Sequence, residues 1–140
     1  MQERIMAYKI NEIEGIGAKY AERLQTAGIK TTDDLLKACG SRKGRDDMAG
    51  QTGFSASQLL KWANMADLMR ISGIGEEYSE LLEAAGVDTV KELATRKADN
   101  LAAKMAEVNA AKKLTRALPA ASQVQKWIDQ AKTMDPAISH

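Results

Sequence analysis

Two short segments, Gly15-Ile16-Gly17 and Gly73-Ile74-Gly75, have the residue types needed to hold an anion. Glycines let the backbone reverse tightly and approach a partner with no side chain in the way. A helix that begins directly after such a turn presents free amide N–H groups and the positive end of its dipole, which together bind phosphate. We therefore predict that each segment is a turn between two helices, pinned to the core by its isoleucine, and a candidate site for a nucleic-acid backbone.

The charges that follow the two turns differ in sign. Lys19 and Arg23 follow the first turn, on the face that would flank a bound phosphate. The second turn is followed by carboxylates, which suit the helix dipole but repel a phosphate at the same amides, at Glu76, Glu77, Glu80 and Glu83. We expect the first turn to be the better phosphate site and the second turn to be weaker. A compact connector that binds nothing remains an equal alternative.

Two further groups of basic residues are candidates for extending a track of phosphate contacts. The first is a short basic loop beginning at Ser41, with the cations Arg42, Lys43 and Arg45, and the second contains Lys112, Lys113 and Arg116. Solvated surface loops are the alternative interpretation of both groups. No helix presents a row of Arg, Asn and Gln side chains, so we expect contacts to the backbone and no readout of base sequence.

The residue types that carry catalysis are missing from plausible positions. The only histidine is His140, in the C-terminal segment, and the only cysteine is Cys39, so neither a histidine base nor a cysteine and histidine metal site is expected. The first glycine segment lacks the third glycine and the preceding strand of a dinucleotide-binding loop. We predict a protein that is not an enzyme and needs no metal or cofactor.

Composition limits the kind of partner and the compartment. Charged residues make up 28% of the chain, yet the net charge is only +1, so no global basic field attracts nucleic acid. The N-terminal segment lacks the apolar core of a signal peptide, and no run approaches the roughly 20 apolar residues of a membrane span. With one unpaired cysteine, a cytoplasmic protein without a membrane partner is expected.

An internal repeat shows which elements hold the two turns. A shift of 58 positions superposes Gly15 on Gly73, and it also aligns Ile13 with Ile71, Tyr20 with Tyr78, Leu24 with Leu82, Gly28 with Gly86 and Leu35 with Leu93. Near the end of each copy, Trp62 aligns with Trp127 at a shift of 65. We interpret this pattern as duplication of a small fold, with repeats over 1–70 and 71–140 that together could form one compact unit.

Apolar spacing and capping residues predict an all-helical protein of about ten helices, five in each repeat. Helices are expected over 5–13, 18–27, 31–39, 41–52 and 55–70, and then over 76–85, 89–94, 99–108 and from a cap at Ser122. We expect an irregular loop over 109–119 and a frayed tail over 134–140. Core positions are assigned to both tryptophans and to the methionines Met48, Met65, Met69 and Met105, although Met65 and Met69 could instead form an interface between the copies.

The segments Ile13 to Ile29 and Ile71 to Val87 resemble the helix-hairpin-helix motif of many DNA-repair and replication proteins. Together with the helices that carry Leu35 and Trp62, the chain resembles, over nearly its whole length, a bacterial family known as domain of unknown function 4332. The resemblance implies two tandem five-helix repeats of SAM or helix-hairpin-helix type and a link to nucleic acid. The favoured hypothesis is non-catalytic, sequence-independent binding of a DNA or RNA backbone, and the alternative is a protein-interaction adaptor.

Overall fold

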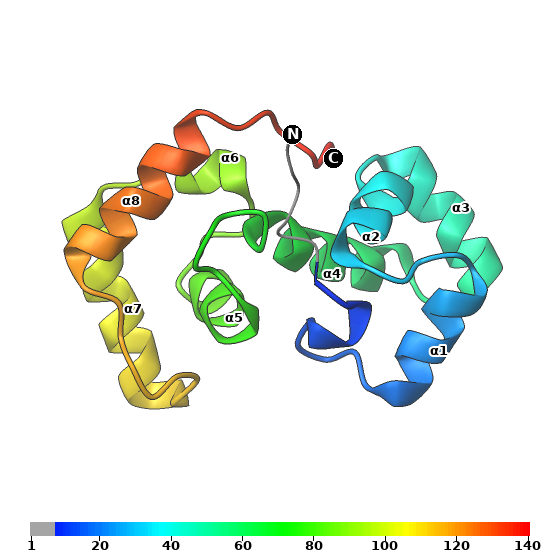
Figure 1. Ribbon diagram of the computed structural model, residues 1–140, viewed down its shortest axis with the longest axis horizontal. Coiled ribbons are helices and arrows are strands. Elements are labelled where there is room, and N and C mark those ends of the chain that lie inside the picture. Colours follow the sequence, from blue (N-terminus) through cyan, green and yellow to red (C-terminus); the bar gives the residue numbers. More distant parts are fainter. Residues whose placement is uncertain (1–7) are drawn as a thin grey trace.

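The computed structural model describes residues 8–140 and confirms the all-helical fold. The first half contains the 3-10 helix η1 (Ile10–Glu12) and the helices α1 (Ala18–Thr26), α2 (Thr32–Cys39), α3 (Arg42–Thr52) and α4 (Ala56–Leu68). The second half contains α5 (Glu76–Ala84), α6 (Val90–Leu93), α7 (Ala98–Lys112) and α8 (Ala121–Lys132). In Figure 1, α1, α2 and α3 lie on one side and α7 and α8 on the other, with α4 and α5 between them.

Side-chain caps explain where several helices begin. The Thr31 hydroxyl accepts a hydrogen bond from the Asp34 amide, and the Asp34 carboxylate accepts bonds from the amides of Lys30 and Thr31 in return. These backbone donors hold the pKa of Asp34 below its ordinary value. The Ser55 hydroxyl caps α4 by accepting from the Gln58 amide, and Gly53 ends α3 in the left-handed conformation, as its sequence position predicts.

The apolar faces of these helices form two core clusters. The first gathers residues from η1 to α4 around Trp62, which is 3% exposed, and the second gathers residues of α5 to α8 around the fully buried Trp127. Tyr20 and Phe54 surround Trp62, and the Phe54 ring lies edge-on to the indole at 4.9 Å between centroids. Both tryptophans therefore occupy the core positions predicted for them.

One buried carboxylate ties the end of α4 to the second half. The Asp67 carboxylate accepts a hydrogen bond of 2.8 Å from the Val90 amide at the start of α6. Its other oxygen accepts a bond of 2.6 Å from Arg70, so the buried charge is paired. Met65 and Met69 on the same stretch are buried in the first core, as the sequence predicts.

Two predicted boundaries in the second half are wrong. The helix expected to end at Val108 continues as α7 to Lys112, because 109–112 contains the strong helix formers Ala110, Ala111 and Lys112. The last helix begins at Ala121, with Ala120 in the cap position and no side-chain cap, so Ser122 lies inside its first turn. In the first half, the helix expected over 5–13 is a 3-10 helix limited to Ile10–Glu12, and 5–7 lie outside the described residues.

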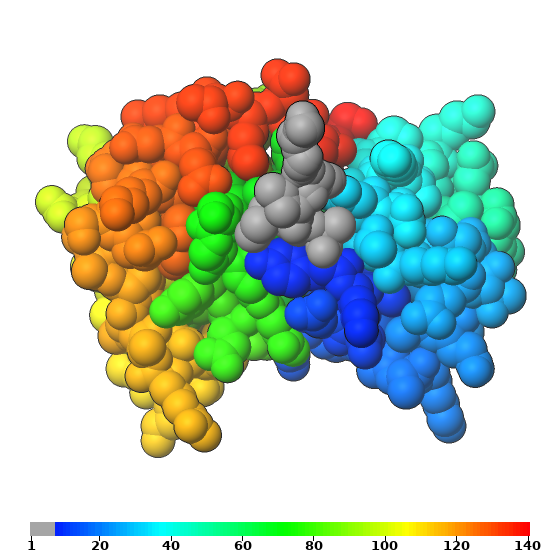
Figure 2. Space-filling model, in the orientation of Figure 1, coloured from blue at the N-terminus to red at the C-terminus, as the bar shows by residue number. Residues whose placement is uncertain are grey.

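The segment after α8 packs on the first half, so the frayed tail predicted there is also wrong. Ile138 contacts the first core cluster, and the Ser139 amide donates a 2.8 Å hydrogen bond to the Gly40 carbonyl. Arg70 donates to the Asp135 carbonyl at 2.9 Å. Figure 2 shows these last residues, in red, against the cyan residues of the first half. No helix in 8–140 has both the length and the apolar character that crossing a membrane requires.

Candidate nucleic-acid interface

The two glycine turns have the same backbone geometry. Gly15 and Gly73 have φ angles of +92° and +94°, and in each turn the amide two residues before the helix donates a 3.1 Å bond three residues back. The isoleucines Ile16 and Ile74 are buried, as predicted, at 4% and 0% exposure. A reversal with positive φ at its first glycine therefore delivers the chain into α1 and into α5.

A tryptophan side chain lies beside the first glycine of each turn. A Cβ atom placed on Gly15 would lie 3.6 Å from the indole nitrogen of Trp62, and one on Gly73 would lie 3.2 Å from that of Trp127. The last helix of each half, α4 or α8, thus places an indole ring next to the first glycine of the turn. This contact gives the aligned tryptophans a shared structural task.

The start of α1 is open to an anion. Its cap residue, Gly17, offers no side chain to the first amides of the helix, and no atom lies within 4 Å of the position that a Cβ would take. The first turn of α1 contains no acidic residue, and Lys19 is exposed there. Free amides, the helix dipole and one lysine therefore converge on a surface that a phosphate can reach.

Arg23, the second cation predicted to flank this phosphate, is exposed but contacts residues at the end of α3 and beyond it. Its guanidinium carbon lies 4.0 Å from the centroid of the Phe54 ring, a cation–π contact. The same group donates a hydrogen bond to the carbonyl of Thr52, the last residue of α3. Arg23 therefore joins α1 to the end of α3, and these contacts fix the position of its guanidinium.

The basic loop predicted around Ser41 is the beginning of α3, with Ser41 as the cap. Arg45 is 4% exposed and donates to the carbonyls of Cys39, Gly40 and Ser139 at 3.0, 3.1 and 2.7 Å. Its placement on a surface phosphate track is therefore wrong: helical periodicity turns it inward, where three carbonyls satisfy it. Arg42 and Lys43 are exposed, but they lie at the end of α3 opposite Thr52, about 15 Å from it along the helix axis.

An asparagine that the sequence interpretation missed shapes the basic segment of the second half. The Asn109 side chain accepts hydrogen bonds from the amides of Leu114 and Thr115 at 2.8 and 3.0 Å. Tyr78 of α5 then donates to the carbonyl of Ala117 at 2.8 Å. These bonds hold the exposed cations of this segment near the second turn, namely Lys112, Lys113 and Arg116. An asparagine just before the end of a helix was the available signal.

Carboxylates of both halves meet beside the first turn, which the sequence did not reveal. A hydrogen bond with the Glu14 carboxyl raises the pKa of Glu76, the first residue of α5. Burial, and next the charge of Glu14, raise the pKa of Glu80 one helical turn later, while Lys61 and Lys112 oppose the change. The sequence predicts negative charge at the second turn alone, whereas in the structure the carboxylates of Glu76 and Glu80 also lie near Glu14 of the first turn.

Comparison with known proteins places the chain in a family without an assigned activity. No curated protein matches the sequence. No solved structure matches it either. Residues 14–134, from the first glycine turn to the end of the second core, match the family described as "Domain of unknown function (DUF4332)". Because the match covers most of the sequence and includes both turns, the chain belongs to this family, the one that its sequence resembles.

Proposed function

We propose that this protein is a non-catalytic, cytoplasmic module of tandem helix-hairpin-helix type that binds DNA or RNA backbones without sequence preference. The observation that carries the proposal is the open, uncapped start of α1 directly after Gly15-Ile16-Gly17, with Lys19 exposed beside it. A phosphate oxygen seated there accepts hydrogen bonds from the backbone amides, while the lysine neutralises its charge. Nothing in this arrangement distinguishes one base from another.

The contact is small, and its salt dependence follows from its size. Because Arg45 is buried and Arg23 is held by Thr52 and Phe54, Lys19 is the cation placed to contact a phosphate at the first turn, with Arg42 and Lys43 as a separate patch. The second turn contributes a weaker contact through its glycine amides and Lys112, Lys113 and Arg116. Each neutralised phosphate adds about −0.9 to the slope of log K against log salt, so a slope between about −1 and −4 is expected for duplex DNA.

Fluorescence anisotropy with a labelled 20-base-pair duplex tests this proposal at about 50 mM salt, where phosphate contacts are favoured. Lys19→Glu is expected to weaken binding about tenfold, since it replaces a charge-assisted contact with a repulsive one. Lys126→Glu changes the net charge equally on the exposed face of α8 and serves as the matched control, with less than a twofold effect expected. No binding by the unaltered protein, or equal losses in the two variants, would refute the proposal.

A protein-interaction adaptor is the second candidate, and the carboxylates around the first turn favour it. Glu14, Glu76 and Glu80 lie where a phosphate backbone passing from one turn to the other would meet negative charge. In this alternative the glycine turns have a structural role and bind no phosphate. A pull-down from the native host separates the two candidates, because a protein partner retained after nuclease treatment is expected only for an adaptor.

A further inference from the structure

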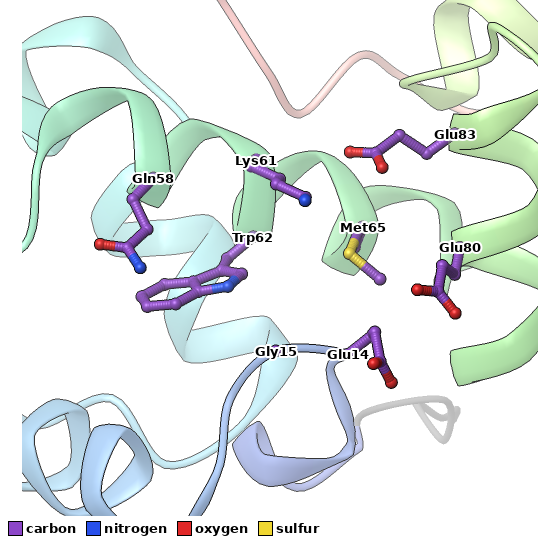
Figure 3. A pocket seen from close by; sticks show the side chains of 8 residues that line it. All are labelled: Glu14, Gly15, Gln58, Lys61, Trp62, Met65, Glu80 and Glu83. Carbon is purple, nitrogen blue, oxygen red and sulfur yellow. The ribbon is translucent and has the colours of Figure 1, made fainter.

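A pocket of about 290 Å³ lies where the two halves meet (Figure 3). The first glycine turn contributes Glu14 and Gly15, α4 contributes Lys61 and Trp62, and α5 contributes carboxylates. Its size is at the lower end of the roughly 300 to 1,000 Å³ of pockets that hold drug-sized ligands. The pocket therefore suits a single side chain or a comparably small group.

Its walls carry more negative than positive charge. Three carboxylates line the pocket, from Glu14, Glu80 and Glu83, and none of them forms an ion pair with a residue in 8–140. Lys61 is the one cation among the lining residues that the structure describes. The raised pKa of Glu80 has partial burial as its largest cause and the charges of Glu14 and Glu83 as the next. A positively charged guest relieves this repulsion.

The indole N–H of Trp62 points to a second feature of the guest. The side chain is 97% buried and lines the pocket, and no hydrogen bond links its Nε1 atom to another residue in 8–140. Figure 3 shows the indole nitrogen on the edge of the ring that faces the hollow between Gly15 and Met65. Because this N–H lies at the wall of the pocket, an oxygen acceptor next to the cation is the complementary group.

We propose that this pocket binds a lysine or arginine side chain of a partner protein. The cationic end lies among Glu14, Glu80 and Glu83, and a main-chain carbonyl of the same segment accepts from the Trp62 indole. A basic residue within a peptide has both groups, whereas a polyamine has the cation without the carbonyl. The inference does not depend on nucleic-acid binding at α1, and it rests on the second, protein-binding candidate, to which it assigns a specific site.

The two tryptophans provide the readout. In ¹H–¹⁵N spectra the indole signals of Trp62 and Trp127 report the pocket and the second core separately, because Trp127 is fully buried there. Titration with the blocked tripeptides acetyl-Gly-Arg-Gly-amide and acetyl-Gly-Lys-Gly-amide is expected to shift the Trp62 signal saturably, with a Kd in the low millimolar range. The Trp127 signal is expected to stay in place. A tripeptide with neutral citrulline in place of arginine is the ligand control.

Matched variants test the assigned contacts. Glu80→Gln is expected to weaken the arginine tripeptide about two- to fivefold, the usual range for an ion pair that is partly exposed to solvent. Trp62→Phe keeps an aromatic ring and removes the N–H. Because this variant has no Trp62 indole signal, peptide binding to it is followed through the backbone amide signal of Gly15. Glu22→Gln alters an exposed carboxylate of α1 outside the pocket, so its affinity is expected to equal that of the unaltered protein. Thermal unfolding of each variant verifies the fold.

Several outcomes would overturn the assignment. One is a Trp62 indole signal that does not move with about 20 mM arginine tripeptide. Another is an equal shift of this signal with the citrulline tripeptide. A third is an equal loss of peptide affinity in Glu80→Gln and Glu22→Gln. Spermidine acting as well as the peptides would identify a polyamine site, and a duplex shifting the same signal would assign the pocket to nucleic acid. Lys19→Glu separates the two proposals, because it is expected to reduce duplex binding and leave peptide affinity unchanged.

Discussion

Three cations that look equivalent in the sequence have different environments in the fold. Lys19 is exposed, the Arg23 guanidinium stacks on Phe54, and Arg45 is buried among carbonyl groups. The acceptor of one Arg45 hydrogen bond is Ser139, 94 positions away. Composition and spacing can predict that a basic residue is present, but whether its charge is free depends on partners that only the folded chain brings close.

The contacts of Arg23 predict a loss of stability when its shape changes and its charge does not. Arg23→Lys removes the planar group that stacks on Phe54 and donates to Thr52, so we expect a loss of about 1–2 kcal/mol in the free energy of unfolding. Lys19→Ala, at an exposed site, is expected to change it by less than about 0.5 kcal/mol. Urea unfolding measures both, and equal midpoints for the two variants would show that the Arg23 contacts contribute nothing.

At the scale of elements, most helices follow from local signals. Thr31, Ser55 and Gly53 act as the caps and stop that the sequence predicts, because these interactions involve residues within a few positions of one another. The apolar pattern alone misplaces some helix ends. The end of α7 is fixed by the Asn109 side chain folding back onto the following turn, a bond that the apolar pattern does not encode.

The two glycines of each turn have different tasks, and alanine substitutions separate them. Gly15→Ala is expected to cost about 1–2 kcal/mol, because φ is +92° there. Gly73→Ala is expected to cost more, since its Cβ would also lie 3.2 Å from the Trp127 indole nitrogen. Gly17 has an extended backbone and open surroundings, so Gly17→Ala is expected to cost only about 0.5 kcal/mol. Chemical denaturation of the three variants checks this order, and an effect of Gly17→Ala equal to that of Gly15→Ala would contradict it.

At the scale of the molecule, the halves are joined by contacts that no local pattern announces. Glu14 and Glu76 are 62 positions apart (76 minus 14), yet the Glu14 carboxyl lies close enough to raise the pKa of Glu76. The repeat predicts two similar units and identifies the turns in each. It does not predict which surfaces of the units face one another, because that depends on long-range contacts such as that of Asp67 with the start of α6.

This meeting of carboxylates predicts a pH-dependent stability. The folded protein raises the pKa of Glu80, so the stabilising contribution of this group is complete below its ordinary pKa of about 4.3 and is lost as pH rises through the raised value. Glutamine cannot ionise, so Glu80→Gln avoids the unfavourable charge at this position. The variant is expected to be more stable than the unaltered protein by less than about 1 kcal/mol at pH 7 and equally stable at pH 4. Denaturation of this variant and of the control Glu22→Gln at both pH values tests the sign. A destabilised Glu80→Gln protein at pH 7 would contradict it.

The hydrogen bonds between Arg45 and Ser139 and between Ser139 and Gly40 also set an order of assembly during synthesis. The α2 and α3 segments are translated early, but one acceptor for the buried guanidinium is added 94 residues later. At translation rates of about 5–20 residues per second, this interval is about 5 to 20 s. Throughout it, the Arg45 guanidinium of the nascent first half lacks the Ser139 carbonyl as an acceptor, so the half that is made first acquires its full set of contacts last.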